Sequence, residues 1–231
     1  MMLETDDPLA IPLWINGHAY LTMAPSFLDV RNPASGQVLR RTPLCGTGEA
    51  LKAAEAAQAA LAQWRAETAV TRAALLAALA DALEGYAGHF TKLIVEETGK
   101  DADAAATEVS AAVALLRRVP ESSISGVVAI VSDDTDPLLG ALSRAVSALR
   151  AGATVVIKPS PKAPSALFAL AELTARNGFP DGVFNILQGD EAAVEGLCTS
   201  SAVSILLFAG NAALAARVGD IALRHDKPFE A

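Results

Sequence analysis

Short apolar runs alternate with amphipathic helical patterns over the second half of the chain. Residues 127–131 and 154–157 are apolar runs of the length of a buried strand. The segment between them opens with Pro137 and ends at Gly152, residue types that suit the first turn and the end of a helix. Its apolar positions recur at helical spacing: Leu138, Leu139, Leu142, Val146 and Leu149. A strand, a helix and a strand within about forty residues predict a parallel βαβ unit with a right-handed crossover.

The same alternation continues to the end of the chain. Strand-like runs at residues 183–187 and 203–208 alternate with further helical patterns, and residues 227–231 are similar to the start of another strand. We therefore expect an α/β fold with a Rossmann-like parallel sheet and helices on both faces. Ligands of such sheets bind at the carboxyl ends of the strands, which here are residues 132–136 and 158–160.

The first half of the chain predicts a small β-hairpin followed by a helical segment. An Asn-Gly turn signal stands at residues 16–17, and four helical patterns follow it. We expect residues 1–10 to form a loose N-terminal arm and residues 11–231 to form one domain. Within that domain, residues 11–119 carry the hairpin and the helices, and residues 126–231 carry the parallel sheet.

Composition and charge narrow the class of protein. Apolar residues make up 52% of the chain, which is enough for a substantial core, and the formal net charge is −8. Clustered Lys and Arg are lacking, so we expect no nucleic-acid binding. No apolar run has the length of a membrane span, and the N-terminus has no signal pattern. We expect a cytoplasmic protein without a membrane partner.

Several motifs follow one another in the order found in a known family. They are WINGHAY, VRNPASGQVL and VEETGK upstream of the βαβ unit, then AGATVVIKPSPKAP and AELTARNGFPDGVFNILQG. Together they resemble the coenzyme-binding half of the aldehyde dehydrogenase superfamily, from Trp14 to about Pro228. The resemblance implies the fold expected above and a site for NAD or NADP. Because function depends on particular residues rather than on the fold, the site residues need separate treatment.

The resemblance implies a cofactor site made of six residues. They are Lys158, Ser160, Gly189, Phe208, Gly210 and Asn211, of which the lysine would contact the adenosine ribose hydroxyls. Four positions depart from the family pattern: Pro161 replaces a glutamate, Glu191 a glycine, Asn211 a serine and Ala215 a glycine. Glycine lets a backbone approach a ligand closely, so these replacements predict a degraded site at which NAD or NADP binding is still possible.

The residues that would carry aldehyde oxidation are missing or changed. In the family, a nucleophilic cysteine lies downstream of a glutamate base, and this chain stops at about the position where that segment begins. Cys45 and Cys198 match neither position, so we assign no catalytic residue. Thr135 stands where the family has an asparagine that stabilises the oxyanion.

Three aspartates surround Thr135 just before the predicted helix. Asp133, Asp134 and Asp136 are favourable there for the helix dipole but unfavourable for an anionic cofactor. The simpler interpretation is that Asp134 or Asp136 caps the helix, and the alternative is a divalent-cation site built from all three carboxylates. We favour capping and assign no metal site.

Three functional hypotheses remain open. The first is a non-catalytic accessory or structural subunit of an oxidoreductase, similar to the C-terminal domain of some bifunctional proline-utilisation flavoenzymes. The second is the NAD(P)-binding half of a split or truncated aldehyde dehydrogenase, with the cysteine on another polypeptide. The third is a recently disrupted gene whose product folds without a function.

Assembly is also expected to differ from the family. Residues 120–125 leave no room for the projecting β-hairpin that the family uses for subunit contacts. The usual dimer and tetramer contacts are therefore not expected, but we do expect a protein partner or self-association.

Overall fold

The computed structural model describes residues 8–118 and 124–231, which form two sheets and eight helices. The strands are β1 (Leu13–Ile15), β2 (His18–Tyr20), β3 (Phe27–Arg31), β4 (Val38–Pro43), β5 (Val127–Ser132), β6 (Thr154–Lys158), β7 (Phe184–Ile186), β8 (Val203–Ala209) and β9 (Phe229–Glu230). The helices are α1 (Thr47–Ala66), α2 (Ala69–Gly85), α3 (Ala87–Thr98), α4 (Ala102–Arg117), α5 (Leu139–Ala151), α6 (Ser165–Arg176), α7 (Glu191–Thr199) and α8 (Ala212–Arg224).

The larger sheet has the order β2-β1-β7-β6-β5-β8-β9. Its five neighbouring strands β7, β6, β5, β8 and β9 are parallel to one another. From β5 the chain winds to β6 and β7 on one side, then crosses back to β8 and β9 on the other. The predicted Rossmann-like α/β fold is thus confirmed. The order reverses between β5 and β8, and reversals of this kind open a crevice at the carboxyl ends of the strands.

The predicted N-terminal hairpin is present and extends the main sheet. The turn at Asn16 and Gly17 joins β1 to β2, and both turn residues have positive φ. Trp14 pairs antiparallel with Ile186 of β7, so the hairpin covers an edge of the parallel sheet. The strands β3 and β4 form a separate two-stranded sheet, and the carbonyl of Leu9 accepts a hydrogen bond from the Arg41 backbone.

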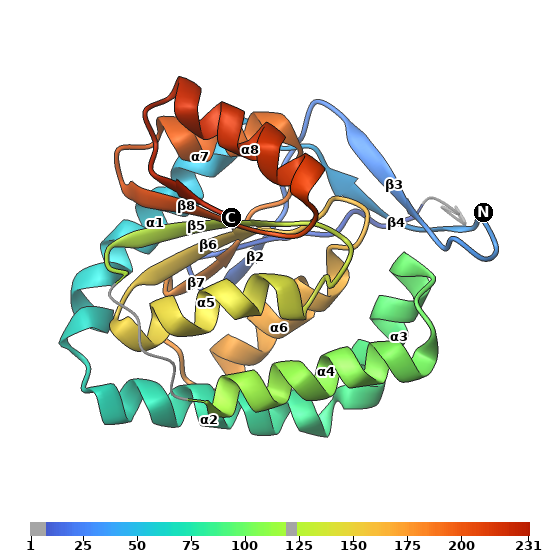
Figure 1. Ribbon diagram of the computed structural model, residues 1–231, viewed down its shortest axis with the longest axis horizontal. Helices are drawn as coiled ribbons and strands as arrows, with labels where there is room; N and C mark the ends of the chain where they lie inside the picture. Colours follow the sequence, from blue (N-terminus) through green and yellow to red (C-terminus); the bar gives the residue numbers. More distant parts are fainter. Residues whose placement is uncertain (1–7, 119–123) are drawn as a thin grey trace, which may run out of the picture.

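Helices cover both faces of the sheet (Figure 1). Helices α1, α7 and α8 pack on one face, around a core that includes Val127, Val156 and Leu206. Helices α5 and α6 pack on the other face, and α2, α3 and α4 form a further layer beneath them. Among the described residues, no helix has both the length and the apolar character of a membrane span.

Two buried glutamates from this outer layer bind the first turns of α5 and α6. Glu108 of α4 accepts hydrogen bonds from the backbone N–H groups of Leu138 and Leu139, at 2.9 and 3.1 Å. Glu97 of α3 accepts one from the Ser165 N–H at 3.1 Å, and another from the hydroxyl of the same residue. A carboxylate at a helix N-terminus satisfies free N–H groups and complements the dipole, so each glutamate fixes where a helix begins.

The start of α5 corrects one expectation from the sequence. Pro137 lies in the turn before the helix, which begins at Leu139. Neither Asp134 nor Asp136 caps the helix through its side chain, because Glu108 of α4 takes that role across 30 residues of sequence. The expected left-handed glycine at the end of α5 is confirmed, since Gly152 has φ +92. Most of the segment 120–125, which we expected to lack the assembly hairpin, lies outside the described residues.

Replacing Glu108 tests the capping of α5. We expect Glu108→Ala to lower the free energy of unfolding by about 2–4 kcal/mol, because two buried N–H groups lose a charged acceptor. Glu108→Gln keeps one acceptor oxygen and should cost roughly half as much. Urea unfolding measures both, with Glu55→Ala at an exposed position of α1 as the control. A loss no larger than that of the control would show that α5 needs no cap from α4.

Candidate functional site

A cavity of about 270 Å³ lies at the carboxyl ends of β5 and β6, between α7 and α8. Its apolar lining is Val131, Val194, Leu214, Val218 and Ile221. Its charged lining is Asp134, Lys158, Lys162, Asp190, Glu191 and Arg217. The cavity is therefore an apolar slot with charged groups at its edges, at the place where parallel α/β sheets bind ligands.

Lys158 is the charged group buried most deeply in this cavity. It is the last residue of β6 and is 5% exposed. Its Nζ donates to the carbonyl oxygens of Pro159 and Gly189, each at 2.9 Å. Burial lowers the pKa of the Lys158 ammonium to about 8, and the negative charge of Asp190 opposes that shift. An ammonium has three donors, so one N–H remains for a ligand in the cavity.

The cavity is lined by three acidic and three basic side chains, so the positive and negative charges around it are equal in number. Glu191 at the start of α7 forms an ion pair with Arg217 of α8, on side chains that are 56% and 66% exposed. Asp190 caps α7 by accepting a hydrogen bond from the Ala192 N–H at 3.1 Å. These acidic groups are therefore already engaged within the protein, which leaves Lys158 as the polar group best placed for a ligand.

Gly189 is required by packing as well as by its conformation. Its φ is +144, and a Cβ at this position would lie 2.6 Å from the Cβ of Ala193 and 3.0 Å from the carbonyl oxygen of Cys45. The residue thus allows the loop after β7 to pass closely between α7 and the loop before α1. Its carbonyl also holds Lys158, so Gly189 shapes the cavity from behind.

A second hollow of about 540 Å³ lies beside the cavity, where α5 and α8 begin. Asp133, which is 3% exposed, accepts hydrogen bonds from the backbone and side chain of Asn211, each at 2.7 Å. It also accepts from the backbone and hydroxyl of Thr135, at 2.9 and 3.1 Å. Burial alone raises the pKa of a carboxyl, yet these four hydrogen bonds hold the pKa of Asp133 below its ordinary value.

Gly210 allows this arrangement. A Cβ there would lie 2.4 Å from the carboxylate of Asp133, and the residue has φ +151. Asn211 is in turn the N-cap of α8, because its Oδ1 accepts a hydrogen bond from the Leu214 N–H at 3.0 Å. A fixed carboxylate therefore lies against the first turn of α8, the part of a helix that attracts anions.

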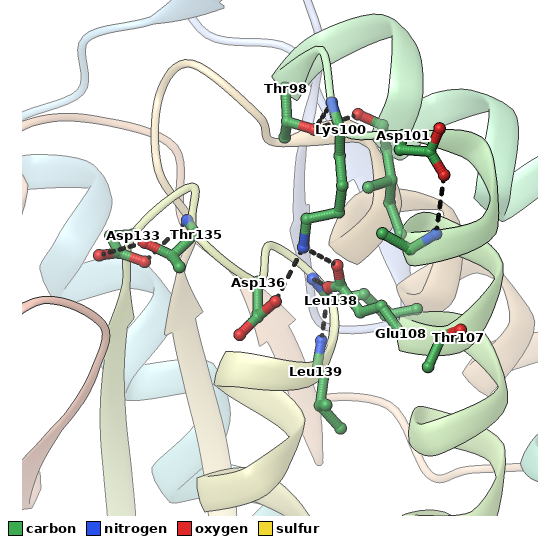
Figure 2. A network of polar contacts seen from close by, with 12 residues as sticks. Thr98, Lys100, Asp101, Thr107, Glu108, Asp133, Thr135, Asp136, Leu138 and Leu139 are labelled. Carbon is green, nitrogen blue, oxygen red and sulfur yellow. Dashed lines mark hydrogen bonds and ion pairs between the residues drawn. The ribbon is translucent and has the colours of Figure 1, made fainter.

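The three aspartates of the sequence do not converge on one point. Figure 2 shows Asp133 facing Thr135, while Asp136 lies apart from them and faces Lys100. The Lys100 Nζ lies 2.8 Å from Asp136 and 2.7 Å from Glu108. Among the residues that the structure describes, no group of three or more His, Cys, Asp or Glu side chains is placed to hold a metal ion.

The six residues assigned by resemblance take different places. Lys158 and Ser160 line the cavity, and the Gly189 carbonyl accepts a hydrogen bond from Lys158 without lining the cavity itself. Gly210 and Asn211 line the second hollow, while Phe208 is buried in the core between the sheet and α8. The apolar wall from Val194, Leu214, Val218 and Ile221 was not assigned to a site, although helical spacing marks three of these residues as inward-facing.

Neither cysteine has the environment of a nucleophile. Cys45 and Cys198 are both buried and unpaired with each other. Burial raises the pKa of the Cys45 thiol to about 12 and that of the Cys198 thiol to about 11. Since the thiolate is the reactive form, both side chains act as small apolar residues.

Comparison with known proteins places these features in a family context. A family model described as the aldehyde dehydrogenase family matches residues 21–125 and 122–230. The chain is 31% identical over 209 residues to a malonate-semialdehyde dehydrogenase of Pseudomonas aeruginosa, covering 81% of this chain and 42% of that enzyme. It is 33% identical over 207 residues to an NADP(+) succinate-semialdehyde dehydrogenase of Escherichia coli, covering 80% of this chain and 43% of that enzyme.

Solved structures agree with the sequence relatives. Lactaldehyde dehydrogenase from Escherichia coli superimposes with a TM-score of 0.88 at 26% identity, over 96% of this chain and 51% of that one. A methylmalonate-semialdehyde dehydrogenase from Sinorhizobium meliloti, complexed with NAD, gives a TM-score of 0.89 over 97% of this chain and 50% of that one. At 21% identity, this second likeness shows the shared fold alone.

Thiol labelling tests the environment of the cysteines. With pKa values of about 12 for Cys45 and about 11 for Cys198, the thiolate fractions at pH 8 are roughly 10⁻⁴ and 10⁻³. We expect Ellman's reagent to label the native protein slowly. In the time that both thiols of the protein in urea take to react, less than about a tenth of one thiol per native chain should react. Prompt labelling of either cysteine in the native protein would contradict the structure.

Proposed function

Because the chain belongs to the aldehyde dehydrogenase family, we propose that the cavity between α7 and α8 binds the adenosine end of NAD or NADP. The chain spans less than half the length of the curated relatives that it matches, 42% and 43% for the two enzymes named above. A dehydrogenase activity would belong to a protein of the relatives' full length, and for this chain it is therefore a proposal as well. The observation that carries it is the placement of Lys158, buried at the edge of an apolar slot with one donor unused.

The residues around this cavity fit an adenosine. The slot between Val194 and Leu214 offers apolar walls for a planar base. Lys158 and Ser160 lie at the polar edge, where an N–H and a hydroxyl can bond ribose hydroxyls. Ser132, at the end of β5, also lines the cavity and carries a buried hydroxyl without a partner, which a ligand would satisfy. When bound, the nicotinamide of such a cofactor accepts a hydride.

The phosphate end fits less well. In a dinucleotide site the first turn of a helix binds the pyrophosphate. Here Asp133 places a negative charge against Asn211, the N-cap of α8, and the backbone N–H and the side-chain Nδ2 of Asn211 each donate a hydrogen bond to that carboxylate. We therefore expect nucleotide binding to rest on the adenosine and to be weakened by the charge of Asp133.

This same carboxylate favours a second candidate, a non-catalytic accessory subunit of an oxidoreductase. In that function the fold is retained for contact with a partner and the cavity needs no ligand. Cys45 and Cys198 fit either function, because neither supplies a thiolate for acyl chemistry. The two candidates differ in whether the isolated chain binds an adenosine nucleotide.

Calorimetry with AMP, NAD and NADP distinguishes the candidates. We expect dissociation constants between about 10 μM and 1 mM, and Lys158→Met should weaken binding by roughly 10- to 100-fold because a charged hydrogen-bond donor is lost. Lys162→Met, at an exposed position of the same cavity, is the matched control and should change affinity by less than about threefold. Absence of binding to the wild-type chain would favour the accessory subunit.

Neutralising Asp133 tests the expected cost at the phosphate end. Asp133→Asn should tighten NAD binding by about fivefold or more, since a charge some 4 Å from a phosphate is worth roughly 1 kcal/mol even in water. Adenosine binding should stay unchanged, as should NAD binding to Asp103→Asn, an exposed control on α4. Unchanged NAD affinity in Asp133→Asn would show that the pyrophosphate does not approach α8.

A further inference from the structure

The edge strand β2 has no charged residue, proline or bulge that would keep another strand from pairing with it. It ends the larger sheet, and in the described part of the chain no strand pairs with its outer side. Its three residues, His18, Ala19 and Tyr20, are all exposed. The opposite edge differs, since Glu230 of β9 places a carboxylate there, 3.2 Å from Arg144. One edge of the sheet thus carries a charge, while the other is open.

The turn before β2 determines which backbone groups face outward. Asn16 and Gly17 form a two-residue turn with positive φ at both positions, and Ile15 pairs with His18 across it. The N–H of His18 closes this turn, so it points toward β1. Orientations alternate along a strand, and the N–H and C=O of Ala19 therefore point away from the sheet. Ala19 thus offers one donor and one acceptor to a further strand.

A second copy of β2, antiparallel to the first and centred on Ala19, satisfies both groups. Two-fold symmetry places Ala19 opposite the partner's Ala19, and the two residues exchange both hydrogen bonds. His18 then lies opposite the partner's Tyr20, and the side chains of such a pair are close enough for their rings to touch. Leu21, which is 71% exposed, lies opposite the partner's Gly17, where no side chain obstructs it.

The charges at the two ends of β2 are of opposite sign. Lys52 of α1 lies at the Tyr20 end, with its Nζ 5.4 Å from the centroid of the ring and 3.1 Å from the hydroxyl oxygen. Asp181, in the loop before β7, lies at the turn end, where its carboxylate leaves no room for a Cβ on Gly17. Both charged residues are exposed. Antiparallel pairing brings each lysine toward the partner's aspartate, whereas parallel pairing would place like charges together.

We infer that the protein self-associates through β2, which pairs antiparallel with β2 of a second copy and joins the two seven-stranded sheets into one. A second copy fits this edge because the edge is self-complementary, with the hydrogen-bonding groups on the two-fold axis and opposite charges on either side of it. The strand has only three residues, so we expect a dimer dissociation constant of about 1–100 μM. The residues of this edge do not line the cavity at Lys158, so the inference is independent of nucleotide binding.

Sedimentation velocity of the full chain from about 1 to 500 μM measures this association. We expect a shift from monomer to dimer as the concentration rises. Ala19→Pro should raise the dissociation constant roughly tenfold or more, because proline removes the outward N–H without taking a hydrogen bond from the pairing with β1. Ala19→Ser keeps the N–H and is the matched control, which should dimerise as the wild-type chain does. Circular dichroism checks that both variants are folded.

Charge reversal tests the contact between Lys52 and the partner's Asp181. Lys52→Glu and Asp181→Lys should each weaken the dimer about fivefold or more, since each brings like charges together on both sides of the axis. The double variant should regain the wild-type dissociation constant, because opposite charges face each other again. Asp220→Lys, at an exposed position of α8, changes the net charge as Asp181→Lys does and should alter the constant less than about twofold.

A monomer over the whole concentration range would overturn the inference. A dimer that Ala19→Pro does not weaken would place the contact on another surface and would overturn it as well. The same holds if the single charge reversals leave the dimer unchanged, or if the double variant stays as weak as they are.

Discussion

The hydrogen bonds from Lys158 to Pro159 and Gly189 fix the geometry on which the candidate site depends. They join the end of β6 to the loop after β7, and that loop packs against Cys45 and Ala193 with no room for a side chain at Gly189. The floor of the cavity is therefore closely packed, and its buried amine, that of Lys158, is held in a defined position. A lysine that only extended into solvent would offer a charge but no fixed position.

Buried carboxylates fix where three helices begin along this edge of the sheet. Glu97 and Glu108 hold the first turns of α6 and α5 from the outer layer, and Asp133 holds the first turn of α8 from the end of β5. The first two stabilise the fold without touching the cavity. Asp133 does the same for α8, but its charge then lies where a dinucleotide would place phosphate. A stable helix start and a good phosphate site thus compete at Asn211.

Local sequence patterns predicted the elements of the fold well. The apolar runs of β5 and β6, and Gly152 at the end of α5, follow from the residue types and their spacing. The glutamate cap of α5 could not be predicted in this way, because Glu108 and Leu138 are 30 residues apart and meet only after α4 packs. The contact between Asp133 and Asn211 spans 78 residues for the same reason.

The site was predicted only in part. Resemblance placed Lys158 and Ser160 in the cavity, but it also included Phe208, whose ring is in the core. The apolar slot arises from the spacing of α7 and α8, which no single segment encodes. A crystal structure with AMP tests the account most directly. It should show adenine between Val194 and Leu214 and a ribose hydroxyl within hydrogen-bond distance of Lys158, and AMP bound elsewhere or absent at saturating concentration would contradict it.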